Sequence, residues 1–285
     1  METVARSSLL PDKKGMLLGI CSLGLFLYAY HETFLWLHER YDNPDSHYSH
    51  GYLIPFICGY LIWQQRKELA ELPRTSSSVG LGLIVMALLV HVVSVWTHTF
   101  FTSGFSIMVL VTGLCLYLYG TEVTKKLAFH VGFLAFMFPL PMRVISAISF
   151  PLKMLVANLG TEIMALSGMP IVREGAMIQL TNASLSVGDP CSGIRSLIAL
   201  MAMGALFAYL LRGGIGRKLL LFLLTIPVAI ATNVLRVCTL IFVAEKLGSE
   251  WASPEHWFHT TSGLAVFIIS MAILFGIMRV LERPE

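Results

Sequence analysis

The chain has 285 residues, of which 56% are hydrophobic and only 13% are charged. A soluble domain carries about 25% charged residues, so this composition excludes an ordinary soluble protein. Together with a mean hydropathy of +0.74, it predicts an all-α polytopic membrane protein. We expect membrane lipids as contacts, and we expect no nucleic-acid partner.

About eight transmembrane helices are expected, since a span needs about 20 apolar residues. The first apolar run lacks a small-x-small cleavage site, so we interpret it as a retained span. Residues 1–285 are expected to form a single integral membrane domain. The predicted spans are residues 16–37, 51–63, 79–96, 100–119, 127–140, 192–211, 219–244 and 257–280, the seventh interrupted by Pro227, Asn233 and Arg236.

The longest segment outside the predicted spans is residues 142–190. Residues 144–166 have apolar side chains at helical spacing interrupted by polar ones, which predicts an amphipathic helix lying at the membrane interface. Residues 171–187 alternate in polarity around a central turn, which predicts a small β-hairpin.

The distribution of basic residues predicts the orientation. With a cytoplasmic N-terminus, most of the 20 Lys and Arg residues fall in cytoplasmic segments, as the positive-inside rule requires. Both termini are then cytoplasmic, and residues 142–190 are extracytoplasmic.

Three predicted spans bring reactive side chains to the outer boundary. Cys191 lies where a polar segment meets the sixth span. Arg236 lies about 17 residues along the seventh span, roughly 25 Å from its cytoplasmic end. His256 and His259 lie at the start of the eighth. The shared depth predicts a site at the outer face.

A cysteine, a histidine and an arginine together suffice for acyl transfer. The cationic neighbours lower the pKa of the Cys191 thiol, and a histidine carries its proton to a leaving amine. Arg236 then stabilises the oxyanion of the tetrahedral intermediate. One helical turn after Cys191, Arg195 is a candidate for binding a carboxylate, and Asn233 is a candidate for holding the Arg236 guanidinium by a hydrogen bond.

Structural interpretations compete with this hypothesis. A lone cysteine at a helix end is more often a small buried hydrophobe than a nucleophile. Arg195 and Arg236 have Glu162, Glu174 and Asp189 as alternative ion-pair partners. An arginine inside a membrane is functional by default, however, and the coincidence of depth favours a site.

No metal or cofactor is expected. The loop around His47 and His50 also contains Asp42 and Asp45, but a solvated loop explains these residues without a metal. The five cysteines form no Cys-x-x-Cys pair, so neither a disulfide framework nor a zinc site is predicted.

Four motifs resemble the exosortase/archaeosortase family. The most specific is residues 190–197, Pro-Cys-Ser-Gly-Ile-Arg-Ser-Leu, which contains Cys191, Ser192 and Arg195. Residues 233–237 and the His-x-x-x-Gly pattern of residues 259–263 are similar to the second and third motifs. Residues 48–55 resemble a common N-terminal feature. One departure is Asp189-Pro190, where many members have a small residue between the acidic residue and the cysteine.

The resemblance implies a membrane cysteine protease or transpeptidase that needs no cofactor. Its substrates are secreted proteins whose C-terminal sorting signal has a short motif (Pro-Glu-Pro in the bacterial type), a transmembrane helix and a basic tail. It implies Cys191 as the nucleophile, Arg236 as the catalytic arginine and His259, rather than His256, as the acid and base. Asp189, Ser192, Arg195, Asn233 and His256 are expected to support the site, which faces outward from the bacterial cytoplasmic (inner) membrane.

Two other functions remain open from the sequence. A membrane acyltransferase would carry a fatty acyl group on Cys191. A non-catalytic transporter would use its intramembrane arginines to bind an anionic solute, but such proteins usually show internal symmetry and broken helices, neither of which is clear here.

Overall fold

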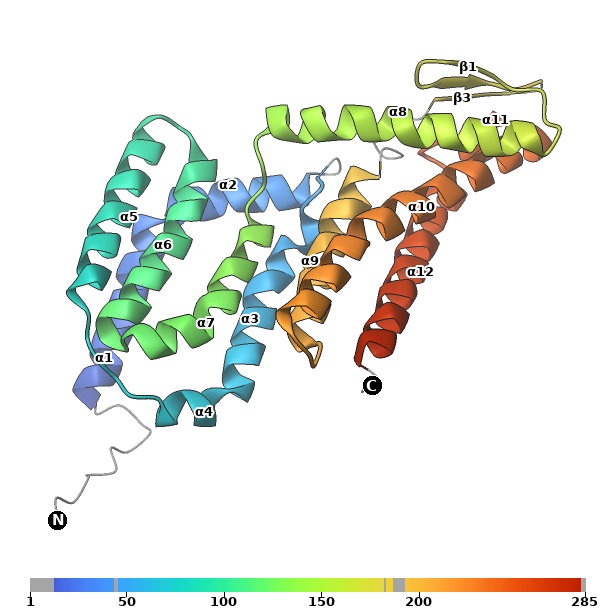
Figure 1. Ribbon diagram of the computed structural model, residues 1–285. Helices are drawn as coiled ribbons and strands as arrows, with labels where there is room; N and C mark the ends of the chain where they lie inside the picture. The colour runs from blue at the N-terminus through green and yellow to red at the C-terminus, as the bar shows by residue number, and fades with distance from the viewer. Residues whose placement is uncertain (1–12, 44–45, 182, 187–192, 283–285) are drawn as a thin grey trace.

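The computed structural model describes residues 13–43, 46–181, 183–186 and 193–282. Most of these residues are helical (Figure 1). The elements are α1 (Lys13–Ala29), α2 (His31–Asp42), η1 (Ser49–Tyr52), α3 (Leu53–Gln64), α4 (Arg66–Glu71), α5 (Ser78–Trp96), α6 (Phe100–Leu118), α7 (Thr121–Phe133), η2 (Leu134–Met137), α8 (Met142–Leu166), β1 (Val172–Glu174), β2 (Met177–Gln179), β3 (Ser184–Ser186), α9 (Ile194–Leu210), α10 (Ile215–Leu247), α11 (Ser249–Ala252) and α12 (Trp257–Glu282).

Among the described residues, five helices are long and apolar enough to cross a membrane. They are α5, α6, α8, α10 and α12, and the bent pair of α1 and α2 makes up to six. The protein is therefore a multi-pass membrane protein with a largely helical fold. The predicted number of eight spans is not confirmed, because α3 with 12 residues and α9 with 17 are shorter than the roughly 20 residues of a full span.

The first predicted span, residues 16–37, is not one straight helix. It is divided into α1 and α2, which meet at an angle of 63° around the fully buried Tyr30. The Tyr30 hydroxyl lies 2.9 Å from Ser106 Oγ, and His91 Nε2 donates a 3.0 Å hydrogen bond to the carbonyl of Ala29. These partners lie far away in the sequence and stabilise the bend by binding groups that the break leaves exposed.

The third and fourth predicted spans are confirmed as α5 and α6, which form a helical hairpin. Both helices have 19 residues, and the turn between them contains only residues 97–99. Gly80 allows the close approach, because a Cβ atom there would overlap the backbone of Tyr117. In Figure 1 the two helices lie side by side at one end of the molecule.

The helix predicted for residues 144–166 is confirmed as α8, which runs across the direction of α5, α6, α9 and α12 (Figure 1). Gly160 of α8 faces α10, where a Cβ atom would come within 2.9 Å of Val237. The expected interruption of the seventh span is wrong, since α10 continues through Pro227 for 33 residues. Proline has no backbone N–H and so removes one hydrogen bond from the helix. This loss is tolerated in a membrane helix whose neighbours satisfy the freed carbonyl group.

The predicted β-hairpin proves to be an antiparallel sheet of three short strands in the order β1-β2-β3. Ile178 of β2 pairs with Leu185 of β3, and both side chains are buried. They belong to a core that includes Val156 of α8, Val237 of α10 and Ala252 of α11. The sheet is thus anchored to the same helices that position the candidate site.

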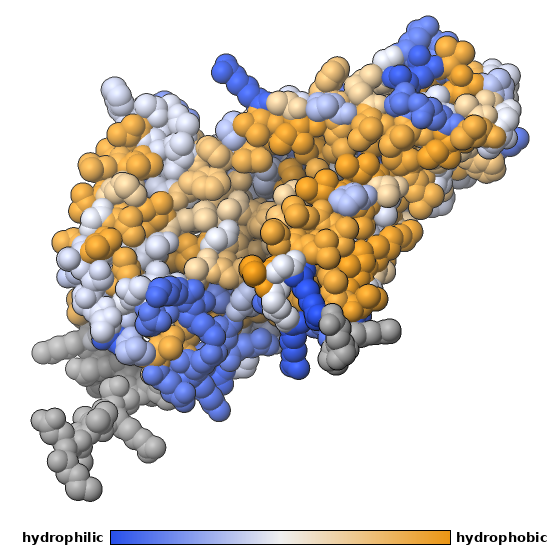
Figure 2. Space-filling model, viewed as in Figure 1, coloured by the Kyte–Doolittle hydropathy of each residue, from blue (hydrophilic) through white to orange (hydrophobic). Residues whose placement is uncertain are grey.

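The outer surface is strongly apolar along the bundle. Phe56 and Trp96 are 76% and 82% exposed, as expected for side chains that contact lipid. Figure 2 shows apolar residues over the middle of the molecule and hydrophilic residues gathered near α4 and near the sheet. In Figure 1, α4, the connections from α6 to α7 and from α9 to α10, and the end of α12 all lie along the lower side of the molecule. These are segments that the charge distribution predicts to be cytoplasmic.

Candidate active site

Arg236 of α10 lies against one face of α12. Its Nη2 donates a 3.2 Å hydrogen bond to the carbonyl of His259, and its Nε lies 3.5 Å from Ser262 Oγ. A Cβ atom on Gly263 would come within 3.3 Å of the guanidinium carbon. Residues three and four apart share a helix face, so His259, Ser262 and Gly263 form a single seat for this guanidinium.

His259 is buried, with 4% of its surface exposed, and its ring is oriented by α11. Nδ1 lies 3.0 Å from the carbonyl oxygen of Ala252. A carbonyl can only accept, so Nδ1 carries the proton in the neutral ring and Nε2 is the basic nitrogen. The geometry therefore prepares Nε2 to take up a proton.

His256 has a different environment. Its ring centroid lies 4.6 Å from that of Trp251 and 5.6 Å from that of Trp257, and its Nδ1 accepts a 3.2 Å hydrogen bond from the backbone N–H of Phe258. The ring is half-buried in an aromatic group at the start of α12. The structure thus distinguishes two histidines whose predicted depth is the same.

A close packing contact joins the start of α9 to α10. Gly193, which precedes α9, has a left-handed backbone with φ of 79°. A Cβ atom there would overlap the side-chain amide of Asn233, which is 2% exposed. Asn233 therefore packs against the residue that follows Cys191 and Ser192 in the sequence.

Replacing Gly193 by alanine is expected to destabilise this junction. A left-handed conformation costs a non-glycine residue roughly 1–2 kcal/mol, and the added methyl group displaces Asn233. The melting temperature of the purified protein in detergent should fall by a few degrees, about the effect of 1–2 kcal/mol. The matched control is Gly214→Ala, where a Cβ atom meets nothing within 4 Å. Equal melting temperatures of the two variants would contradict the close contact between Gly193 and Asn233.

Asp189, Ser192 and Cys191 lie outside the described residues. Arg195 is exposed on the first turn of α9. Two of the glutamates expected as its ion-pair partners have other hydrogen bonds. Glu162 accepts a 2.8 Å hydrogen bond from Asn158 Nδ2, and Glu174 accepts one of 3.4 Å from Gln179 Nε2. Among the described residues, no ion pair joins Glu162 or Glu174 to Arg195 or Arg236.

The comparison with protein families identifies the relationship. Residues 36–276 match the model of the transmembrane exosortases. The chain belongs to this family. The comparisons with curated proteins and with solved structures find no match. Membership supports a transmembrane enzyme that processes sorting signals, in agreement with the resemblance of the four motifs.

Two features of the exosortase site could not be found from the motifs alone. The first is Ser262, which lies inside the third motif and contacts Arg236. Its position three residues after His259 was the available signal. The second is the hydrogen bond of 2.7 Å between Thr232 of α10 and Ser270 of α12, both buried. It joins the two helices, and no sequence spacing predicts this pair.

The N-terminal motif of the exosortase, residues 48–55, has a packing role. The Tyr48 hydroxyl accepts a 3.2 Å hydrogen bond from the backbone N–H of Leu140, and a Cβ atom on Gly51 would overlap the Tyr41 ring. Burial lowers the pKa of His50, which favours the neutral form of its ring. Among the described residues, no group of three or more His, Cys, Asp or Glu side chains could hold a metal ion.

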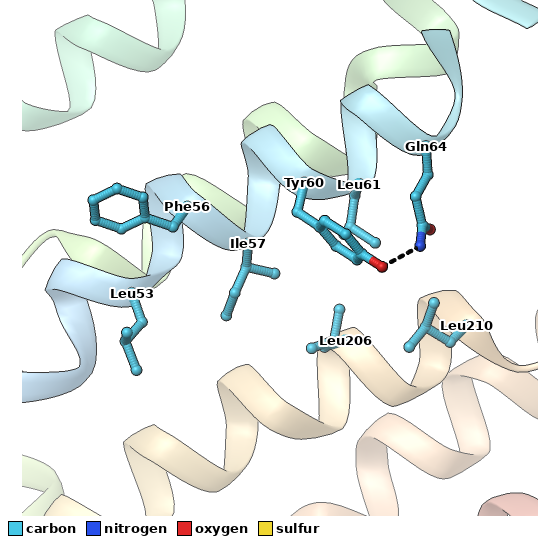
Figure 3. Close-up of a pocket in the computed structure, with 8 residues that line it drawn as sticks. All are labelled: Leu53, Phe56, Ile57, Tyr60, Leu61, Gln64, Leu206 and Leu210. Atoms are coloured by element: carbon cyan, nitrogen blue, oxygen red, sulfur yellow. Dashed lines mark hydrogen bonds between the residues drawn. The ribbon is translucent and has the colours of Figure 1, made fainter. Parts of the chain in front are cut away.

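An apolar groove of about 500 Å³ lies between α3 and α9 (Figure 3). Leu53 and Ile57 point toward α9 from α3, Leu206 and Leu210 point back from α9, and Phe56 lines the edge. Its polar contribution is the 2.8 Å hydrogen bond from Gln64 Nε2 to the Tyr60 hydroxyl. The lining suits an apolar chain or helix and offers no nucleophile.

Proposed function

We propose that the protein cleaves the C-terminal sorting signal of secreted proteins through a thioester acyl-enzyme on Cys191. The observation that carries the proposal is the seat of Arg236 on α12, formed by the carbonyl of His259 and the hydroxyl of Ser262. One turn earlier on α10, Asn233 packs against Gly193, which lies two residues after Cys191. Two residues of extended chain span at most about 7 Å, so the sequence tethers Cys191 close to this seat.

The reaction has two steps. Nε2 of His259 takes the proton of the Cys191 thiol, and the thiolate attacks the carbonyl carbon of the scissile peptide. Arg236 stabilises the resulting oxyanion, which is most effective where water is excluded. The C–N bond then breaks, and His259 gives the proton to the leaving amine. Water or an amine acceptor resolves the thioester, and no cofactor is needed.

The remaining motif residues have supporting roles in this proposal. Arg195, exposed at the start of α9, is positioned to bind a substrate carboxylate such as the glutamate of a Pro-Glu-Pro motif. Asn233 holds the start of α9 in place through Gly193. We assign Asp189 and Ser192 to the same neighbourhood because they flank Cys191 in sequence. His256 belongs to the aromatic boundary beside the site.

The substrate explains the location of the site. A sorting motif lies just outside its own membrane helix, so the nucleophile belongs at the outer boundary of the bacterial cytoplasmic membrane. In this arrangement both termini are cytoplasmic, and α8 lies at the outer interface. The eight spans are then the bent pair of α1 and α2 together with α3, α5, α6, α7, α9, α10 and α12. Two features of the groove between α3 and α9 support the proposal. Its lining is apolar, and α9, which forms one of its walls, begins directly after Gly193. The groove would receive the helix of the sorting signal.

Mass spectrometry of a co-expressed substrate tests the proposed function. A secreted protein with a Pro-Glu-Pro motif, an apolar helix and a basic tail is expected to lose the helix and end at or beside the motif. The mass of its new C-terminus also reports whether water or an amine resolved the thioester. A substrate that stays full length, together with a fatty acyl group on Cys191, would instead establish the acyltransferase hypothesis.

The two histidines provide a paired test of the acid and base. His259→Ala is expected to lower the processing rate by a factor of about 10² to 10⁴, the usual contribution of a general acid or base. His256→Ala should retain most of the activity, because its ring packs among tryptophans away from the Arg236 seat. Both rates are measured by pulse-chase of the substrate. Equal losses in the two variants would refute the assignment of His259.

A further inference from the structure

The groove between α3 and α9 changes from apolar to polar along its length. Six of its eight lining residues are Leu, Ile or Phe, and the other two are Tyr60 and Gln64 of α3. Gln64 Nε2 donates a 2.8 Å hydrogen bond to the Tyr60 hydroxyl. Figure 3 shows this pair across from Leu206 and Leu210 of α9. The groove is therefore apolar over most of its length and ends at two polar side chains.

One contact sets the register of the two helices that form the walls. Gln65, the residue after α3, donates a hydrogen bond from its Nε2 to the Tyr209 hydroxyl of α9. Both helices run in the same direction, from the side of α8 toward the side of α4 (Figure 1). Residues counted back from this contact therefore lie at matching depths.

The register gives the apolar wall a length. Ile194, the first residue of α9, lies roughly 24 Å from Leu210, because each residue of a helix rises about 1.5 Å. Cys191 precedes Ile194 by three residues in the sequence. The proposed nucleophile and the polar pair thus mark the two ends of the α9 wall.

This wall is shorter than the apolar core of a bilayer. That core is about 30 Å thick, and a helix needs about 20 apolar residues to cross it. In comparison, α9 has 17 residues and α3 has 12. Beside Gln64, the guanidinium carbon of Arg66 lies 4.3 Å from the centroid of the exposed Trp63 ring, an arrangement typical of a membrane interface. The interface is therefore reached after a shorter apolar stretch than an ordinary span has.

We propose that the groove measures the apolar helix of the sorting signal and selects helices of about 16 residues. This inference rests on the function proposed above, to which it adds a length requirement for the substrate. A helix of this length leads from the scissile peptide at the Cys191 end to its first polar residues beside Tyr60 and Gln64. There the Gln64 amide and the Tyr60 hydroxyl bind those polar side chains. A longer apolar helix places leucine side chains against these groups and deprives them of hydrogen-bond partners.

A series of co-expressed substrates tests the length requirement. Their helices contain about 14, 17, 20 or 23 apolar residues before the first polar one. The substrate with about 17 is expected to be processed about tenfold faster than the one with about 23, the effect of leaving one buried polar group without a partner. Tyr60→Phe combined with Gln64→Leu should remove this difference, because an apolar end accommodates the longer helix equally well. Pulse-chase labelling measures the rates.

Disulfide crosslinking tests the docking without turnover. In a Cys191→Ala background, Leu210→Cys should crosslink to a substrate cysteine about 16 residues after the motif. Leu53→Cys should crosslink to one about four residues after it, the depth given by the register of α3 and α9. Val92→Cys is the control, since this residue of α5 is 63% exposed on another helix and should form no crosslink.

The outcomes separate this inference from the proposed function. Tyr117→Phe, which removes the hydroxyl of an exposed tyrosine of α6, should keep the wild-type length dependence. Equal processing of all four lengths by the wild type, or an unchanged length dependence in the double variant, overturns the inference and leaves the proposed cleavage intact. If the double variant fails to insert into the membrane, Gln64→Leu alone should still shift the optimum toward longer helices. Failure of the wild type to cleave any length contradicts the proposed function, and absent crosslinks then contradict the groove as well.

Discussion

Cys191→Ala is expected to abolish processing of the sorting signal while the protein remains inserted in the membrane. Under the proposed mechanism no other group can form the thioester, so the loss should reach the detection limit rather than a partial rate. The substrate should accumulate at full length, with its helix and basic tail intact. Pulse-chase labelling and mass spectrometry of the substrate measure this outcome.

The control for this prediction is Cys115→Ala, which removes a half-buried cysteine of α6 far along the chain from the site. It should process the substrate as the wild type does. Cleavage of the substrate by Cys191→Ala at a wild-type rate would refute the nucleophile. Loss of activity in both variants would mean that the cysteine changes act through stability, and a membrane-insertion assay would reveal it.

Arg236→Lys is expected to reduce the rate of processing by a factor of about 10² to 10³, although the positive charge is kept. The guanidinium contacts the His259 carbonyl through Nη2 and Ser262 through Nε, and it packs against Gly263. A lysine ammonium is a compact charge that cannot reproduce this planar arrangement. Because Arg236 is proposed to act on the oxyanion, kcat should fall while KM changes little.

Arg279→Lys provides the matched control. Arg279 lies near the opposite end of α12, exposed to solvent and 3.4 Å from Glu282. Its replacement should leave both kinetic constants unchanged. Reconstituted protein in lipid vesicles, titrated with a membrane-anchored substrate, separates the two constants. A variant Arg236→Lys that shows a raised KM at an unchanged kcat would show that Arg236 binds substrate rather than the oxyanion.

The long apolar helices could be predicted because composition alone determines them. Residues 79–96 and 100–119 are continuous apolar runs separated by a few polar residues, and α5 and α6 follow them closely. The bend between α1 and α2 could not be predicted in the same way. No proline or glycine lies at Tyr30, and the groups that stabilise the bend, His91 and Ser106, come from other helices.

The candidate site was predictable to a similar extent. Counting residues along the spans brought Arg236 and His259 to the same depth, and the structure places them in contact through the His259 carbonyl. Depth alone cannot choose between His256 and His259. The distinction depends on the carbonyl of Ala252 in α11, four residues of helix whose contact with the ring no periodicity reveals.

The seat of Arg236 also bears on how the protein is made. The described groups that hold the guanidinium, and Ser270 that joins α10 to α12, all belong to α12. A ribosome delivers α10 to the insertion machinery before α12 exists, and a charged arginine is costly within the bilayer. We therefore expect α10 to be inserted into the bilayer together with α12, after α12 has been synthesised. The proposed active site is then complete only after α12 has been synthesised, near the end of biogenesis.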